Sequence, residues 1–398
     1  MDVCLNQKHR TLQQIQLRWK DSSQIIPFLL PDGYSKEARA LGAGTYGVVI
    51  WTESTRKRTN GKANEFAIKK FRTPMITEEM AKRCYRELRL LQHLQHDNIA
   101  RIVDLYSEAA HPSELNDVFL VMEYVGSTLE KHIDDQRKSL QCKERIVRLD
   151  MPLIPRIVRD ILSALLYLTA ANVLHRDLKP SNLAITGQGK TVLLDFGLAR
   201  TDDNSEKTEG ACTPCYAAPE IVFLRSKEYG HEVHIWGVGC ILFELLTWHT
   251  LFEDPKKMKE TMILYIELFG TIDDAFLDSI RKDARDGIKK IHAAVLEKKA
   301  KDRVELNSYF AQRNKIAQLP RDIAVLDLIR RCVQFDPAAR ITVEDALNHD
   351  FVRGSGAAVP LPDYSKVEAF VDDGDRSIED WKCQIFKEIR DFRAREDT

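Results

Sequence analysis

Residues 175–197 open with the octapeptide His175-Arg176-Asp177-Leu178-Lys179-Pro180-Ser181-Asn182 and end, after a short apolar run, with Asp195-Phe196-Gly197. In this pattern Asp177 is suited to accept a hydroxyl proton and Lys179 to contact a phosphate. Asn182 and Asp195 carry the hard oxygen atoms that Mg2+ binds. The pattern predicts transfer of a phosphoryl group, a reaction in which a protein supplies mainly positioning and positive charge. The alternative, a surface loop that happens to be acidic, does not explain the fixed spacings.

These signatures resemble the H-R-D-x-x-x-x-N and D-F-G sequences of the protein kinases. The resemblance implies an α+β, bilobal protein kinase fold with a small β-rich N-lobe and a larger, mostly helical C-lobe. It implies ATP and Mg2+ as cofactors, Asp177 and Lys179 as catalytic residues, and Asn182 and Asp195 as metal ligands. Because Lys179 follows Asp177 by two positions, as in kinases that act on Ser and Thr, protein serine/threonine kinase activity is expected.

Length and composition limit the alternatives. The 398 residues suit two lobes with extensions better than one compact core. With 59 basic and 60 acidic residues, the net charge of −1 predicts no partnership with nucleic acid or membranes. The longest apolar run, residues 235–248, contains Glu244 and is too short to span a bilayer. The polar start lacks a signal peptide and the eight cysteines are scattered, so a cytoplasmic or nuclear location is expected.

A glycine-rich segment at residues 41–49 matches G-x-G-x-x-G-x-V, and residues 66–69 follow it as a predicted strand. Glycines let backbone amides approach phosphates closely. The resemblance implies that Lys69 holds the nucleotide phosphates, whereas a lysine on a strand is more often simply exposed. Met122 falls at the gatekeeper position, and residues 122–126 form the expected hinge. The implied nucleotide contacts are Leu41, Gly42, Ala43, Gly44, Thr45, Tyr46, Gly47, Val49, Ala67, Lys69, Met122, Glu123 and Val125.

Residues 77–94 are predicted to form a helix capped by Thr77, with an apolar stripe of Met80, Cys84, Leu88 and Leu91. Glu87 lies beside this stripe, and the resemblance implies that it pairs with Lys69 and takes part in catalysis. Residues 85–91 are similar to the corresponding helix of the mitogen-activated protein kinases, a family of the CMGC group. Within that family the chain most resembles the stress-activated subgroup.

The resemblance extends over roughly residues 35–393 and implies a division of the chain. We expect an N-terminal extension at 1–33, the N-lobe at 34–125, the C-lobe at 126–352 and a C-terminal extension at 353–398. Residues 271–318 resemble the insert of the mitogen-activated kinases. Ser377 is predicted to cap a helix whose apolar face includes Trp381 and Ile385, and such a helix needs a partner surface.

The activation segment departs from the family. Thr208 stands where the family has the threonine of its T-x-Y switch, but Gly210 replaces the tyrosine. Pro214 and Ala217 replace the two arginines that receive phosphotyrosine. The resemblance implies that Arg83, Arg86, Arg176 and Arg200 receive a phosphate on Thr208, although a solvated helix face explains Arg83 and Arg86 equally well. The alternative is that acidic residues of the segment occupy these arginines without any phosphate.

Three other departures are informative. His234 stands where these kinases have an aspartate that accepts backbone hydrogen bonds from the catalytic loop, so the loop is expected to be held less firmly. Residues 353–359 lack the acidic cluster that docks basic partner motifs. Cys212 and Cys215 form a C-x-x-C, for which two reduced cysteines are the ordinary interpretation and a redox switch the alternative.

Two function classes follow. The first is an active MAP-kinase-type enzyme, because every nucleotide, base and metal position is filled. The second is a kinase-fold scaffold with weak or lost activity, suggested by His234, Gly210, Pro214 and Ala217. The expected partners are protein substrates and an upstream activating kinase acting on Thr208, and the chain is expected to be a monomer.

Overall fold

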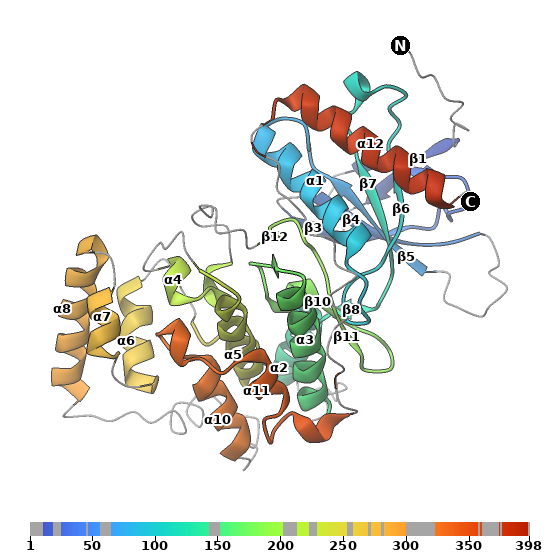
Figure 1. The fold of residues 1–398 in the computed structure, drawn as a ribbon. Coiled ribbons are helices and arrows are strands. Elements are labelled where there is room, and N and C mark those ends of the chain that lie inside the picture. Colours follow the sequence, from blue (N-terminus) through green and yellow to red (C-terminus); the bar gives the residue numbers. More distant parts are fainter. Residues whose placement is uncertain are drawn as a thin grey trace. The chain divides into compact units, whose positions relative to one another are not determined.

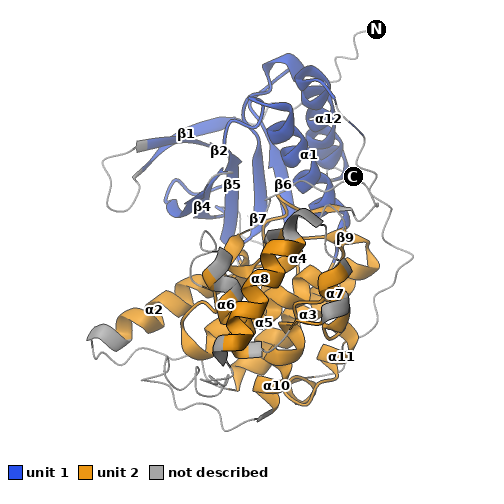
Figure 2. Cartoon of the chain, turned by 90° about the vertical axis from the view of Figure 1, so that its left-hand side faces the viewer, with its two compact units in different colours: residues 1–95, 100–124, 373–398 blue, residues 96–99, 125–372 orange. Residues whose placement is uncertain are grey.

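The computed structural model describes residues 11–18, 25–44, 47–55, 65–142, 152–201, 213–222, 229–252, 258–269, 272–279, 282–299, 323–356, 359, 374 and 376–396 (Figure 1). The chain divides into two compact units (Figure 2). Unit 1 comprises residues 1–95, 100–124 and 373–398, and unit 2 comprises residues 96–99 and 125–372. The division after Tyr124 falls within the segment expected to be the hinge.

Unit 1 is built on a five-stranded antiparallel sheet of order β3-β4-β5-β7-β6. The strands are β3 (Arg39–Gly44), β4 (Gly47–Glu53), β5 (Glu65–Phe71), β6 (Ile102–Tyr106) and β7 (Phe119–Glu123). Ile50, Ile68 and Val121 are directly opposite one another on these strands and are fully buried. They belong to one core cluster with Phe28 and Leu30, so one face of the sheet is apolar and covered.

That cover is a hairpin of β1 (Leu12–Arg18) and β2 (Ile25–Pro31). Ile15 and Leu17 from β1 and Phe28 and Leu30 from β2 are buried in the same cluster. The sequence predicted only an N-terminal extension here, at residues 1–33, and no hairpin. Alternation is present only over short runs such as Ile15 to Leu17, which is too little to predict a strand by itself.

Helix α1 (Glu78–His93) begins as predicted, since the Thr77 side chain accepts a hydrogen bond from Met80 N. Cys84, Leu88 and Leu91 are buried. The prediction for Met80 was wrong, because its side chain is 39% exposed. Met80 lies in the first turn, whereas the contacts of α1 with the C-terminal helix come from later turns, at Tyr85, Arg89 and Gln92.

The C-terminal helix α12 (Ile378–Glu396) begins at the predicted cap, where Ser377 Oγ accepts a hydrogen bond from Asp380 N. It packs on α1, on β6 and on the 3-10 turn η1 (Pro112–Glu114). Trp381, Ile385 and Ile389 are buried, and the rings of Tyr85 and Trp381 are 5.3 Å apart. The partner surface that this amphipathic helix needs is therefore mainly the outer side of α1.

Replacing Trp381 with alanine should destabilise unit 1 by about 3–5 kcal/mol, because a buried aromatic side chain is lost and a cavity is left behind. Chemical denaturation of the Trp381→Ala variant measures this change. Lys387→Ala, on the exposed side of the same helix, is the matched control and should change stability by less than about 0.5 kcal/mol. Equal stability of the two variants would show that α12 does not contribute to the folded core.

Unit 2 is mostly helical. Its helices are α2 (Leu129–Cys142), α3 (Leu153–Ala170), α4 (Pro219–Val222), α5 (Glu232–Thr247), α6 (Met258–Phe269), α7 (Asp274–Ser279), α8 (Lys282–Lys299), α10 (Ile323–Cys332) and α11 (Val343–Leu347). α5 is buried along nearly its whole length and packs against α3 and α10, so it forms the centre of the unit. Arg340 donates to both carboxylate oxygens of Glu220 at 2.6 and 2.7 Å, and this buried pair joins α4 to the segment after η4 (Pro337–Ala339).

Short strands of unit 2 flank residues 175–182 and the Asp195-Phe196-Gly197 segment. A three-stranded sheet has the order β11-β10-β8, from β11 (Thr191–Leu193), β10 (Leu183–Ile185) and β8 (Ser127–Thr128). β9 (Val173–Leu174) pairs with β12 (Arg200–Thr201). The remaining 3-10 turns are η2 (Pro180–Asn182), η3 (Pro214–Tyr216), η4 (Pro337–Ala339) and η5 (Arg353–Ser355). The two units have the β-rich and helical character predicted for a bilobal α+β fold, and none of the described helices has the length and apolarity needed to cross a membrane.

Candidate active site

Four of the nucleotide residues predicted in unit 1 share one face of its sheet. Val49 lies opposite Lys69, and Ala67 lies opposite Met122. Because residues two apart on a strand point to the same side, Val49, Ala67, Lys69 and Met122 lie on the face opposite the hairpin-covered core. Glu123 ends β7, and Val125 begins the adjoining segment of unit 2.

The glycine-rich segment connects β3 to β4. Leu41 is 42% exposed, and the pairing of β3 with β4 is irregular between Ala40 and Gly42. Gly47 cannot carry a side chain, since a Cβ atom there would lie 2.4 Å from the carbonyl oxygen of Lys70. Ala43 and Gly44 complete β3, whereas Thr45 and Tyr46 lie outside the described residues.

Lys69 and Glu87 are joined as the resemblance implied. Lys69 Nζ is 2.6 and 2.9 Å from the two carboxylate oxygens of Glu87. The residues are 5% and 1% exposed, so each charge depends on the other. The pair fixes an ammonium group on β5 at the face where the other predicted nucleotide residues lie.

In unit 2 the centre of the site is the carboxylate of Asp177, which is 7% exposed. Lys179 Nζ lies 2.7 Å from its Oδ2 atom, and Asn182 Nδ2 donates to the same oxygen at 3.0 Å. Asn182 Nδ2 also donates to the backbone oxygen of Asp177 at 2.8 Å. The three residues predicted from the octapeptide therefore form one hydrogen-bonded cluster.

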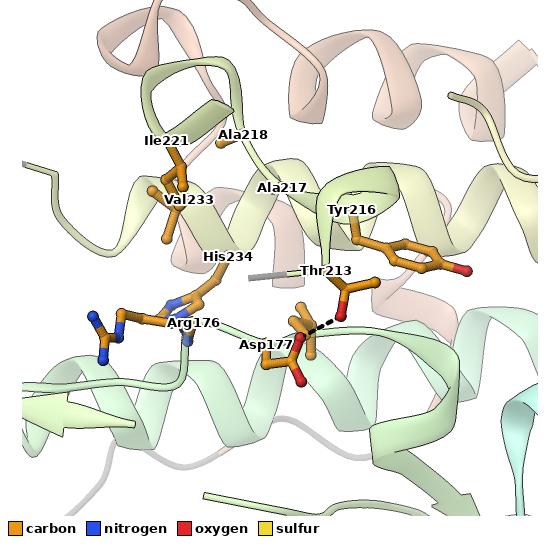
Figure 3. Close-up of a pocket in the computed structure, with 10 residues that line it drawn as sticks. Arg176, Asp177, Thr213, Tyr216, Ala217, Ala218, Ile221, Val233 and His234 are labelled. Carbon is orange, nitrogen blue, oxygen red and sulfur yellow. Dashed lines mark hydrogen bonds between the residues drawn. The ribbon is translucent and has the colours of Figure 1, made fainter. Parts of the chain in front are cut away.

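Thr213 completes this cluster, and sequence analysis assigned it no role. Its hydroxyl donates to Asp177 Oδ1 at 2.6 Å (Figure 3). The same hydroxyl accepts a hydrogen bond from Lys179 Nζ at 2.8 Å. A lone threonine between two cysteines carries no spacing signal of its own. Its fixed distance from Ala218-Pro219-Glu220 was the feature that could have identified it.

The two predicted metal ligands lie beside adjacent strands: Asn182 directly precedes β10, and Asp195 follows the last residue of β11 by two positions. Leu183 of β10 is opposite Leu193 of β11, and Leu194 N donates to the backbone oxygen of Asn182 at 2.8 Å. Asn182 and Asp195 therefore lie at the same end of these two antiparallel strands. Since Asn182 uses Nδ2 for its bonds to Asp177, its Oδ1 atom is the one that can bind a cation.

This donor set fits Mg2+. It offers carboxylate and amide oxygens, and Mg2+ commonly takes only one or two carboxylates and completes its shell with water and phosphate. Among the described residues no group of three His, Cys, Asp or Glu side chains forms a complete metal cage. When bound, the metal would neutralise charge on the phosphates.

The regulatory arginines are divided between the units. On α1 of unit 1, Arg83 pairs with Glu79 and Arg86 is buried. In unit 2, Arg176 and Arg200 are buried, and Arg176 Nε donates to Leu198 O at 2.7 Å. Thr208 and Cys212 lie outside the described residues, so the phosphate receptor stays a prediction, and both interpretations of the C-x-x-C, two reduced cysteines or a redox switch, stay open.

A further polar cluster surrounds Glu244 on α5. Its carboxylate accepts hydrogen bonds from the Tyr216 hydroxyl at 2.6 Å and from Arg137 Nη2 at 2.8 Å. Burial raises the pKa of Glu244, and burial next to that carboxylate raises the pKa of the Tyr216 phenol. The cluster ties the segment after Thr213 to α5. Sequence analysis missed it because its members come from three separate segments.

Burial also lowers the pKa of His234 well below its ordinary value of 6.5, and the neighbouring His231 and His175 lower it further. The unfolded chain takes up a proton at His234 near pH 6.5, but the folded chain does not, so stability falls as the pH drops below 6.5. His234→Gln should therefore shrink the difference in unfolding free energy between pH 7 and pH 5, measured by denaturation. An unchanged difference in His234→Gln would contradict the assignment.

Comparison with known proteins identifies the family of this chain. The protein kinase domain family matches residues 35–352, so the chain belongs to the protein kinases. It is 35% identical over 368 residues to mitogen-activated protein kinase 12 of Danio rerio, covering 92% of this chain and 91% of that protein. It is 31% identical over 401 residues to mitogen-activated protein kinase p38a of Drosophila melanogaster, covering 99% and 96%. Within the protein kinases it is therefore a serine/threonine kinase of the mitogen-activated type.

This membership implies ATP as a substrate and a divalent metal in the reaction. It also implies protein substrates and upstream kinases. The comparisons give no support to the kinase-fold scaffold as an alternative.

Proposed function

We propose that this chain transfers the γ-phosphoryl group of ATP, with Mg2+, to serine and threonine hydroxyls of proteins in intracellular signalling. The observation that carries the proposal is the cluster around Asp177, where a buried carboxylate is held by Thr213, Lys179 and Asn182. A carboxylate fixed in this way is a suitable acceptor for the proton of an incoming hydroxyl.

The other residues have roles that follow from their chemistry. Lys179, beside the base, would contact the transferring phosphate. Lys69, held by Glu87, would hold the α and β phosphates against the glycine-rich segment. Asn182 and Asp195 would bind Mg2+. The adenine would be contacted by backbone groups near Met122, Glu123 and Val125.

The test is direct phosphorylation of a degenerate Ser/Thr peptide library by the purified full-length chain with radiolabelled ATP and Mg2+. Label is expected on serine and threonine, and no label is expected without Mg2+. Asp195→Asn, which weakens a predicted metal ligand, should lose transfer while remaining folded by circular dichroism. A wild-type protein that gains thermal stability with Mg2+ and ATP but labels no peptide would overturn the proposal.

We propose that a single phosphate group controls the activity of this chain. The tyrosine position and both of its receptor arginines are replaced together, by Gly210, Pro214 and Ala217. A single phosphate on Thr208, added by an upstream kinase, would then be sufficient to order the activation segment through the arginines. We further propose a monomer located in the cytoplasm or nucleus.

Substrate preference should differ from that implied by the family at the residue after the phosphorylated one. Ala217 places only a methyl group where the family has an arginine that helps to select proline. It lines a cavity of about 20 Å3 beside Asp177, together with Tyr216 and Ile221 (Figure 3). We expect a kcat/KM ratio for proline over alanine below about 10-fold, and a higher ratio for Ala217→Arg. A peptide array measures both, and a strong dependence on proline in the wild type would contradict this prediction.

A further inference from the structure

His234 is a buried histidine in the first turn of α5, and none of the roles described above uses it. Its residue is 2% exposed. Its Nε2 atom accepts hydrogen bonds from His175 N at 3.0 Å and from Arg176 N at 3.4 Å. These are the two residues directly before the base Asp177. One ring nitrogen therefore serves both amide groups, whereas the sequence predicted only that the loop would be held less firmly.

The backbone at this point needs support. Arg176 has φ +65°, a left-handed conformation that is unfavourable for a non-glycine residue. The next amide in the chain, Asp177 N, donates to His175 Nδ1 at 3.3 Å. Three consecutive amide groups, of His175, Arg176 and Asp177, are thus bound by two imidazole rings.

The hydrogen bonds determine the tautomer of each ring. His234 Nε2 accepts, so the proton must be on Nδ1 and the ring must be neutral. His175 Nδ1 accepts, so its proton is on Nε2, which lies 2.9 Å from Leu194 O. Burial lowers the pKa of both rings, which agrees with neutral imidazoles.

The opposite tautomer of His234 is unfavourable. In the described part of the chain His234 Nδ1 has no hydrogen-bond partner, so the Nδ1–H tautomer leaves one buried donor unpaired. With the proton on Nε2, two buried backbone donors would lose their acceptor and face a third N–H. Losing the acceptor of two backbone donors costs more than leaving one ring donor unpaired, so the proton is on Nδ1.

We propose that His234 is a positioning residue for phosphoryl transfer: as the neutral Nδ1–H imidazole, it holds the backbone of residues 175 and 176 and thereby aims the carboxylate of Asp177. This inference rests on the proposed function. Misplacing a reacting group by about 1 Å can cost about 100-fold in rate. Since the hydrogen bonds of His234 go to the backbone directly before the base, its loss should act on kcat rather than on nucleotide binding.

Two variants of the full chain test the proposal kinetically. His234→Leu replaces the imidazole with an apolar side chain of similar size and so removes the hydrogen-bond acceptor. It should lower kcat about 100-fold, with KM for ATP nearly unchanged. His234→Gln places an amide oxygen near the position of Nε2 and should recover kcat to within about 10-fold of the wild type. Full activity in His234→Leu, or equal impairment of both variants, would overturn the inference, because packing alone would then explain the residue.

A spectroscopic measurement does not depend on activity. Long-range 1H–15N correlation spectra of the 15N-histidine-labelled wild type at pH 7 distinguish the two neutral tautomers and the imidazolium ion. We expect Nδ1–H for His234, assigned by its absence in His234→Gln, and Nε2–H for His175. An Nε2–H or charged His234 would overturn the inference, whereas a wild type with the expected tautomers but no kinase activity would refute only the proposed function.

Discussion

Asp177→Asn should lower kcat for peptide phosphorylation by about 10²–10⁴-fold. The amide has the shape of the carboxylate but cannot accept the hydroxyl proton of the substrate. The Thr213 hydroxyl and the Lys179 ammonium group lose a charged acceptor in the same change. KM for ATP should change little, because Asp177 acts on the hydroxyl group rather than on the nucleotide.

Steady-state kinetics with one peptide from the library measures this effect. The control is Asp350→Asn, which removes an exposed carboxylate of unit 2 that pairs only with the exposed Arg353 among the described contacts. The control should keep wild-type kcat and KM. A folded Asp177→Asn variant with wild-type turnover would remove the base from the mechanism and would leave Thr213 and Lys179 as the groups to examine.

The site residues that could be predicted from the sequence are those that lie close together along the chain. Asp177, Lys179 and Asn182 lie within six consecutive residues, and the same hydrogen-bonded turn brings them together. Lys69 and Glu87 are 18 residues apart on different elements, so their pairing was implied by the resemblance rather than by the spacing.

The parts that sequence analysis missed depend on contacts between distant segments. Thr213 reaches Asp177 across 36 positions, and Tyr216 reaches Glu244 across 28. Nothing local to a threonine or a tyrosine reveals such a partner. His234 was recognised as unusual, but only the ring position shows that its Nε2 atom accepts from two amides.

Met80 and the β1–β2 hairpin illustrate the limits of periodicity. Met80 continues the apolar stripe of α1, yet it is exposed because burial depends on what covers each turn. The hairpin is buried on one side by residues of a sheet that follows it in sequence. In both cases the deciding partner lies elsewhere in the chain.

Lys69→Met should lower kcat by about 10²–10³-fold and also destabilise unit 1 by about 3–5 kcal/mol. The rate falls because a preorganised positive charge is lost from the predicted phosphate site. Stability falls because the carboxylate of Glu87, 1% exposed, is left buried without its ammonium partner.

The double variant Lys69→Met/Glu87→Met separates the two effects. Replacing both members of a buried ion pair with apolar side chains of similar size is often neutral or stabilising, so the stability should return while the activity stays lost. Lys70→Met is the matched control on the same strand. Its ammonium group pairs with Asp117 at 3.2 Å in a partly exposed setting, where such a pair contributes only about 0–1 kcal/mol. Recovery of kinase activity in the double variant would show that Lys69 serves the fold alone and makes no contribution to phosphoryl transfer.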